Sequence, residues 1–199
     1  YAADEGKKHL QKEAAVLSRM ILKYEKPKHH TFCGEKTEDV ILLCNRNNRQ
    51  ITARQIQTGE VSMLAGGVRI QGADLQEIAK IRTWQELLFP LHGKVEREYT
   101  AEAAAQTVWN TEIMELLQSL HEEKGAFLFR IEYKGSLDER KKSEFVKKTA
   151  SLLEEKSERM LINSISDYEI EIRIVESKKG GYLPFLRLYT MEDERFAYR

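Results

Sequence analysis

The alternation of apolar and polar residues in the second half of the chain predicts three β-strands. Residues 126–135 (AFLFRIEYKG) and 168–175 (YEIEIRIV) place a large apolar side chain at every second position. This pattern is typical of a strand with one buried face. Residues 182–190 (YLPFLRLYT) follow a turn with two glycines and predict the second strand of a hairpin. Along residues 168–175, the charged side chains are expected to face water: Glu169, Glu171 and Arg173.

Apolar residues spaced three and four positions apart predict helices at three places. Residues 136–156 carry a clean apolar stripe, and residues 101–123 carry a longer one behind Thr100, an acceptable N-cap. Residues 7–25 show the same spacing before Pro27 interrupts it. The expected order in the second half is therefore helix, strand, helix, strand, strand.

The first half mixes short strands with a short helix, and the fold class expected for the whole chain is α+β. Residues 45–48 (NRNN) read as a polar turn, and Pro90 favours an edge position for the strand that contains it. Strand-like segments are residues 39–44, 50–56, 59–72 and 85–93, and the helix is expected at residues 73–81.

The composition is that of a packed protein without an excess of either charge. The chain has 199 residues, of which 41% are hydrophobic and 32% charged, and its formal net charge is zero. It lacks the basic excess that often marks nucleic-acid-binding proteins, although a local basic face remains compatible with zero net charge. No run of residues approaches the ~20 apolar residues of a membrane span. A cytoplasmic protein without a membrane segment is expected.

No motif in the chain predicts a catalytic, cofactor or metal site. The glycine cluster LAGGVRIQG lacks the spacing of a dinucleotide-binding loop and reads as a hairpin turn or bulge. The chain has no G-x-S-x-G nucleophile motif. His29, His30, Cys33 and Cys44 are zinc-ligand types, but their spacing matches no zinc motif, so a solvated loop is the preferred interpretation. No catalytic residue and no metal ligand is therefore expected in this segment.

A basic stretch is the remaining candidate for a binding surface. The helix at residues 136–156 and the hairpin turn SKKGG carry lysines that suit contacts with phosphate. An ordinary charged helix surface is the alternative interpretation. The candidate RNA-binding residues are Lys134, Lys141, Lys142, Lys147, Lys148, Lys178, Lys179 and Arg187.

The second half resembles the THUMP domain, an RNA-binding module of enzymes that modify tRNA and rRNA. The resemblance rests on FLFRIEYKG, the basic helix, NSISDYEIEIRIVE and YLPFLRLYT, in that order. It implies a small ferredoxin-like domain before the THUMP-like domain, with GADLQEIAKIRTWQELLFPL resembling the end of the former. The expected division is residues 1–95 for the N-terminal helix and ferredoxin-like domain, and residues 96–199 for the THUMP-like α/β domain.

The resemblance implies the RNA-binding region of an S-adenosylmethionine-dependent RNA methyltransferase, with structured tRNA or rRNA as its partner. The Asn- or Asp-Pro-Pro-aromatic loop and the S-adenosylmethionine glycine loop of that family are absent from these residues. DERFAYR resembles the junction to the catalytic domain, so the cofactor and the chemistry are expected beyond Arg199.

Two alternatives remain open from the sequence. One is the THUMP region of an enzyme with another chemistry, such as tRNA thiolation. The other is a non-enzymatic protein-interaction module whose charged faces are only solvated. The sequence leaves open the RNA, the methylated atom and the oligomeric state.

Overall fold

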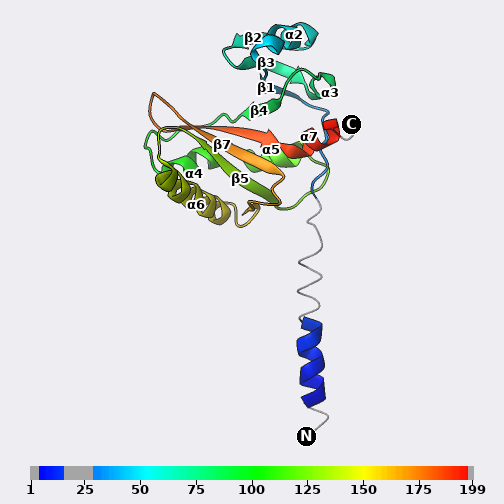
Figure 1. Cartoon of the computed structure of the whole chain (residues 1–199), viewed down its shortest axis with the longest axis vertical. Coiled ribbons are helices and arrows are strands. Elements are labelled where there is room, and N and C mark those ends of the chain that lie inside the picture. Colours follow the sequence, from blue (N-terminus) through cyan, green and yellow to red (C-terminus); the bar gives the residue numbers. More distant parts are fainter. Residues whose placement is uncertain (1–4, 16–28, 197–199) are drawn as a thin grey trace.

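The computed structural model describes residues 5–15 and 29–196. A mixed eight-stranded sheet in the order β2-β3-β1-β4-β8-β7-β5-β6 forms the centre of the molecule (Figure 1). All neighbouring strands pair antiparallel except β5 with β6 and β5 with β7, which pair parallel. The strands are β1 (Thr37–Leu43), β2 (Glu60–Leu64), β3 (Gly67–Asp74), β4 (Glu86–Pro90), β5 (Phe127–Lys134), β6 (Leu161–Asn163), β7 (Ile170–Glu176) and β8 (Tyr182–Leu188).

Helices pack on the sheet, and the expected α+β class is confirmed. Residues 5–15 form an exposed helix, and residues 16–25 of the helix predicted there lie outside the described residues. The helices of the main body are η1 (Arg46–Asn48), α2 (Arg49–Gln55), α3 (Leu75–Lys80), α4 (Ala101–Trp109), α5 (Ile113–Ser119), α6 (Glu139–Lys156) and α7 (Tyr189–Phe196).

The strands predicted from alternation are confirmed, but the strand-like interpretation of residues 50–56 is wrong. That segment is helix α2, which buries Thr52 and leaves Ile51 exposed. The hydroxyl groups of Thr52 and Thr83 are hydrogen-bonded at 2.6 Å. A bond to a residue 31 positions away therefore helps to fix the buried side of α2.

The edge position expected for Pro90 is also wrong, because β4 lies between β1 and β8 inside the sheet. Pairing with β1 ends at Leu88, and Pro90 pairs only with Phe185 of β8. The proline is the last residue of its strand, where a missing N–H costs the sheet little.

The single helix predicted at residues 101–123 is divided into α4 and α5. Thr100 caps α4 as expected, since its hydroxyl accepts a hydrogen bond from the Ala103 amide at 3.1 Å. The Asn110 amide side chain donates to the Lys94 carbonyl at 3.0 Å. Glu112 then has a left-handed backbone with φ 54°. These features end α4 and turn α5 across the sheet.

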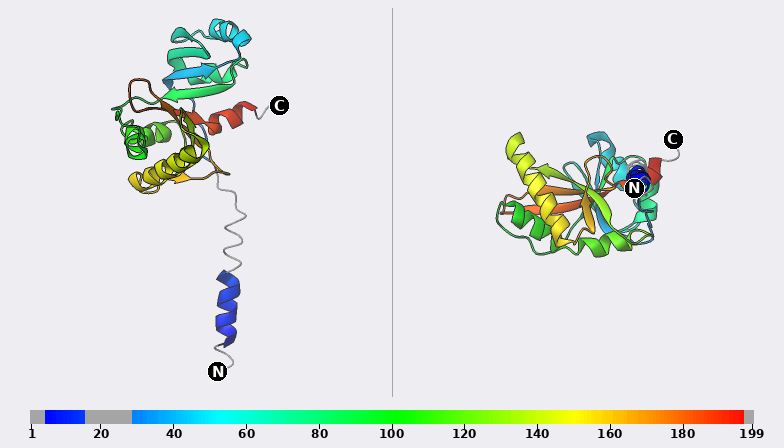
Figure 2. Two further views of the ribbon diagram at one scale, coloured as in Figure 1. Left: turned by 60° about the vertical axis from the view of Figure 1, so that its left-hand side comes forward. Right: turned by 90° about the horizontal axis from the view of Figure 1, so that it is seen from below.

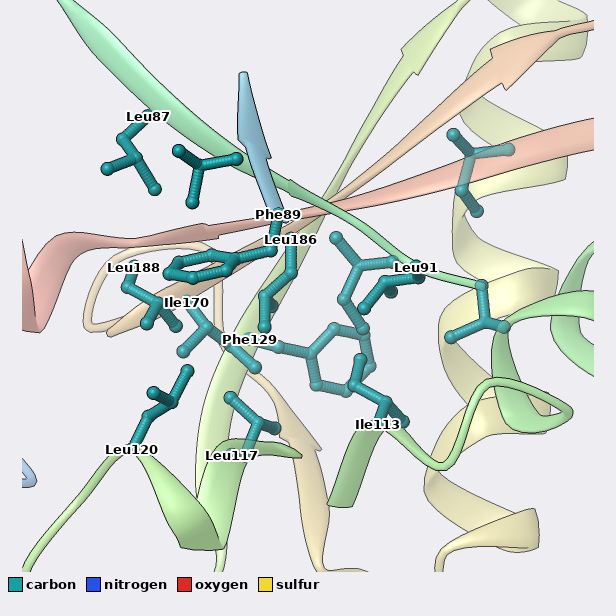
Figure 3. Close-up of a cluster of buried hydrophobic side chains, with 14 of the residues drawn as sticks. Leu87, Phe89, Leu91, Ile113, Leu117, Leu120, Phe129, Ile170, Leu186 and Leu188 are labelled. Carbon is teal, nitrogen blue, oxygen red and sulfur yellow. The ribbon is translucent and has the colours of Figure 1, made fainter. Parts of the chain in front are cut away.

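The turn of α5 creates the main hydrophobic cluster (Figure 3). Apolar side chains of α5 lie against side chains from the central strands of both halves of the sheet. The labelled members are Leu87, Phe89, Leu91, Ile113, Leu117, Leu120, Phe129, Ile170, Leu186 and Leu188.

Strand β4 joins the two halves of the chain. It pairs with β1 of the first half and with β8 of the second half. The division into residues 1–95 and 96–199 stays a prediction. The strands on either side of that division belong to one hydrogen-bonded sheet.

Helix α7 (residues 189–196) includes the first four residues of DERFAYR, the segment that resembles the junction to a catalytic domain. Met191 and Thr190 of this helix are buried. The Thr190 hydroxyl is hydrogen-bonded to His121 Nε2 at 2.7 Å. Helix α7 therefore packs on the body of the protein.

Residues 29–33, expected to form a solvated loop, instead pack against the second half. The His30 ring stacks on Phe127 with centroids 3.8 Å apart, and its Nδ1 is hydrogen-bonded to the buried Glu169 carboxylate. The Thr31 amide and hydroxyl both donate to Glu123 at 2.6 Å, and these bonds lower the pKa of Glu123 to about 2. The segment before β1 is thereby fixed beside the end of α5.

The buried side chain of His121 contacts His30 and Phe127, and we expect it to make the stability depend on pH. Burial lowers the pKa of its imidazole from 6.5. At a pH somewhat below about 6.5, His121 is protonated in the unfolded chain but still neutral in the folded protein. Protonation therefore favours the unfolded state, and the free energy of unfolding falls as the pH falls. We expect urea denaturation to show this fall between about pH 7.5 and about pH 5.5. The His121→Gln variant is expected to show a shallower dependence, and an unchanged dependence would contradict the assignment.

Candidate nucleic-acid interface

Five of the eight predicted RNA-binding residues adjoin the carboxyl ends of two parallel strands. Lys134 is the last residue of β5, opposite Val175 of β7. The turn after β7 contributes two lysines, and the first turn of α6 contributes two more. All five are exposed except Lys142, which is half-buried. This lysine group consists of Lys134, Lys141, Lys142, Lys178 and Lys179.

Glu176 holds the segments of the lysine group together. Its carboxylate accepts hydrogen bonds from the Ser136 hydroxyl at 3.0 Å, from the Ser136 amide at 3.2 Å and from the Tyr133 hydroxyl at 2.8 Å. The bonds from Ser136 and Tyr133 lower the pKa of Glu176. The end of β7 is thus fixed to the connection between β5 and α6.

The lysine group lies beside the amino end of α6, where the helix dipole adds partial positive charge. Asp138 caps the helix, and its carboxylate accepts a hydrogen bond from the Lys141 amide at 2.9 Å. The helix predicted at residues 136–156 is confirmed as α6, which begins three residues later than predicted, at Glu139. The surface at this end therefore gathers five lysines, beside the carboxylates of Glu132, Asp138, Glu139 and Glu176.

Two further predicted residues, Lys147 and Lys148, lie farther along α6 and are exposed. Lys148 Nζ lies 2.5 Å from the Glu102 carboxylate of α4. This contact lowers the pKa of Glu102. Lys148 thus connects α6 to α4, and the structure places Lys147 beside it.

The eighth predicted residue, Arg187, does not join the lysine group. It projects from β8 onto the other side of the sheet, where its guanidinium donates to Glu192 at 2.9 Å and to Glu86 at 2.9 Å. Its Cζ carbon lies 4.5 Å from the centre of the Tyr189 ring. The Arg187 guanidinium is therefore already bound to carboxylates of this protein.

Glu171 and Arg173 of β7 and Glu169 just before it are buried, so the expectation that these three side chains face water is wrong. Glu171 is 1% exposed and accepts hydrogen bonds from Arg130 at 2.8 Å and from Arg173 at 2.7 Å. Arg173 also donates to Glu86 at 2.9 Å. We call the residues that these bonds join the sheet-face network: Glu86, Arg130, Glu171, Arg173, Arg187 and Glu192.

Electrostatics explain how these charges remain buried. Burial opposes ionisation of Glu171, but hydrogen bonds from Arg130 and the charge of Arg173 outweigh burial and lower its pKa. Among the described residues, three guanidinium groups face three carboxylates, so these six charges sum to zero. A buried charge is tolerated when it is paired and hydrogen-bonded in this way.

The described residues contain no group of His, Cys, Asp and Glu side chains that could hold a metal ion.

The glycine cluster is the turn of the β2–β3 hairpin, as predicted. A Cβ on Gly67 would meet the Leu42 carbonyl oxygen at 2.0 Å, so only glycine fits where these two strands approach each other.

Within the described ranges, no helix is long and apolar enough to cross a membrane.

Solved structures of low sequence identity align with most of this chain. TrmN from Thermus thermophilus aligns with 74% of this chain and 45% of its own length, with a TM-score of 0.53 and 14% identity. SMU.472 complexed with SAH aligns with 77% of this chain and 42% of its own, with a TM-score of 0.51 and 13% identity. The fold is that of THUMP-containing proteins. The fold expected from the sequence resemblance is therefore confirmed.

A 4-thiouridine synthetase in complex with RNA and bound ATP also aligns, over 77% of this chain and 42% of its own, with a TM-score of 0.47 and 13% identity. No protein-family model and no curated protein matches the sequence. The chain spans less than half the length of each of these three structures.

Within the THUMP fold, one sequence signal could have revealed the sheet-face network. Strands β5 and β7 carry charges of opposite sign that fall opposite each other in the parallel register, Arg130 with Glu171 and Glu132 with Arg173. The signal is visible only once the two strands are known to be neighbours. Glu86 gives no such signal, because it lies 87 positions from its partner Arg173.

Proposed function

We propose that this chain is the RNA-binding, substrate-recognition region of an S-adenosylmethionine-dependent RNA methyltransferase acting on tRNA or rRNA in the cytoplasm. The observation that carries the proposal is the lysine group at one end of the sheet. Phosphate contacts supply most of the affinity in sequence-independent nucleic-acid binding. Structured RNA is read largely by shape and phosphate position. A rigid module with a group of exposed lysines at one end suits that task.

The fold supports the same proposal. TrmN and SMU.472 share it, and SMU.472 was solved with SAH, the by-product of methyl transfer from S-adenosylmethionine. The sequence contains no cofactor loop or Pro-Pro loop. In the proposal the cofactor and the catalytic residues therefore belong to a domain outside these 199 residues. A tRNA-thiolating enzyme is the alternative, and cofactor binding by the full-length protein distinguishes S-adenosylmethionine from ATP.

The proposal is tested by removing charge from the lysine group. The triple variant Lys141→Ala, Lys178→Ala, Lys179→Ala is expected to bind a tRNA or an rRNA hairpin more weakly than the parent. Each lost phosphate contact should reduce the slope of log affinity against log salt by about one. These side chains are exposed, so the thermal midpoint should stay unchanged.

A matched control removes the same charge elsewhere. The control is the triple variant Lys7→Ala, Lys8→Ala, Lys12→Ala. These three lysines lie on the exposed helix of residues 5–15. This variant should retain the parent's affinity and salt slope. Equal behaviour of the two triple variants would contradict the site. Absence of salt-dependent RNA binding by the parent would favour a protein-interaction module.

A second variant, Lys147→Ala with Lys148→Ala, tests whether the interface extends along α6.

A further inference from the structure

The face of β5, β7 and β8 turned away from α4 and α6 carries the sheet-face network. Figure 2 shows α4 and α6 together on one side of these strands. Phe129 and Ile170 point toward that side and are fully buried. Arg130 and Glu171, the next residues along their strands, point to the opposite side. There the Arg130 side chain is 32% exposed.

Two tyrosine rings hold the Arg130 guanidinium in place. Its Cζ carbon lies 4.2 Å from the centre of the Tyr168 ring and 5.8 Å from the centre of the Tyr189 ring. Its Nε and Nη2 donate to one Glu171 oxygen at 3.2 and 2.8 Å, and Nη2 also donates to the Tyr189 hydroxyl at 3.1 Å. The plane of the guanidinium is therefore fixed before any ligand arrives.

Arg130 differs from the other two arginines of the network. Arg173 and Arg187 donate through Nε and both terminal nitrogens, and their side chains are 10% and 15% exposed. Arg130 Nη1 has no hydrogen-bond acceptor among the described residues. The outer end of the network thus presents an oriented N–H group on a partly exposed arginine side chain.

The neutral charge of the network decides which ligand fits. Among the described residues its three arginines are balanced by three carboxylates, so a free phosphate ion gains little from the field of these six charges. A nucleobase offers a flat surface for stacking and carbonyl or ring-nitrogen acceptors at its edge. Unpaired bases stack on aromatic side chains and on guanidinium planes in this way.

The location also fits an RNA held by the lysine group. Lys134 lies four residues from Arg130 on the same face of β5, a separation of about 13 Å along the strand. A short unpaired segment of a bound RNA can bridge that distance. Glu132 lies between them and is paired with Lys134 at 3.4 Å.

We propose that Arg130, supported by Tyr168 and Tyr189, binds one unpaired nucleotide of the RNA, with the base stacked on the guanidinium and an acceptor of that nucleotide bound to Nη1. This inference rests on the proposed function. It adds a site that distinguishes unpaired from paired RNA, whereas the lysine group contacts phosphates of either.

The test compares an RNA hairpin with blunt ends and the same hairpin carrying a short unpaired extension, at each end in turn. For the parent protein, one extension is expected to tighten binding about tenfold, the order reported for stacking of one base. Arg130→Lys keeps the charge but removes the planar group. This variant should bind the blunt hairpin like the parent and lose most of the gain. Tyr168→Leu, which removes the supporting ring, should lose part of it.

Arg173→Lys is the matched control, because Arg173 belongs to the same network but has no free terminal nitrogen. It should retain the full gain from the extension, with folding checked by thermal denaturation. A gain that persists in Arg130→Lys, a gain lost equally in Arg173→Lys, or no gain in the parent would overturn the inference. Failure of the parent to bind the blunt hairpin would instead overturn the proposed function.

Discussion

Replacing Glu171 with glutamine is expected to lower the free energy of unfolding by about 3–5 kcal/mol, the usual cost of removing one partner from a buried ion pair. The carboxylate is 1% exposed and lies between the guanidinium groups of Arg130 and Arg173. Without its charge, Arg173 keeps Glu86, at 2.9 Å, as its remaining ionic partner among the residues that the structure describes. Urea denaturation at neutral pH measures the loss.

The exposed pair of Arg140 and Glu144 provides the control for this substitution. These side chains lie 3.9 Å apart on the surface of α6. Glu144→Gln should change the free energy of unfolding by less than about 0.5 kcal/mol, because water already solvates both charges. If Glu171→Gln were equally mild, the sheet-face network would contribute little to stability.

The pKa of Glu171 adds a test by acid. Because the folded pKa is lowered from 4.5, the carboxylate stabilises the protein above the unfolded value. That contribution is lost as the pH falls below 4.5 through the folded pKa. The parent should therefore lose stability in this range more steeply than Glu171→Gln.

Phe89→Ala is expected to lower the free energy of unfolding by about 3–5 kcal/mol, because it removes a large ring from a packed core. Phe89 is buried on β4, opposite Leu186 of β8, and lies in the cluster under α5 (Figure 3). Leu183→Ala on the exposed side of β8 is the control and should cost less than about 1 kcal/mol.

The position of Phe89 also predicts where the loss appears. Because β4 pairs with both β1 and β8, the substitution should reduce hydrogen-exchange protection in both halves of the sheet. Protection measured at β1 and at β7 tests this expectation. Loss confined to one half would show that the halves unfold independently, in agreement with the division proposed near residue 95.

The sequence by itself determined the elements whose pattern is local. Strands β5 and β8 and helix α6 were predicted because every apolar residue of their buried faces recurs at the period of the element. The cap at Thr100 and the β2–β3 turn were also predicted, since each depends on neighbouring residues. The candidate lysines were identified from their clustering on α6 and on the hairpin turn.

Only the tertiary structure decided the features that depend on distant partners. Residues 49–55 became a helix with Thr52 buried against Thr83, and α4 ended where Asn110 met Lys94. Lys134 joined Lys178 because β5 and β7 are parallel neighbours, which no short segment reveals.

The charges of β7 make the same point most clearly. Alternation alone assigns Glu171 and Arg173 to a solvated face, since an isolated charge is costly to bury. Arg130 lies 41 positions from Glu171, and Glu86 lies 87 positions from Arg173, yet the sheet brings all four side chains together. Burial of a charge is decided by the partner that compensates it, and the folded sheet, not the local pattern, supplies that partner.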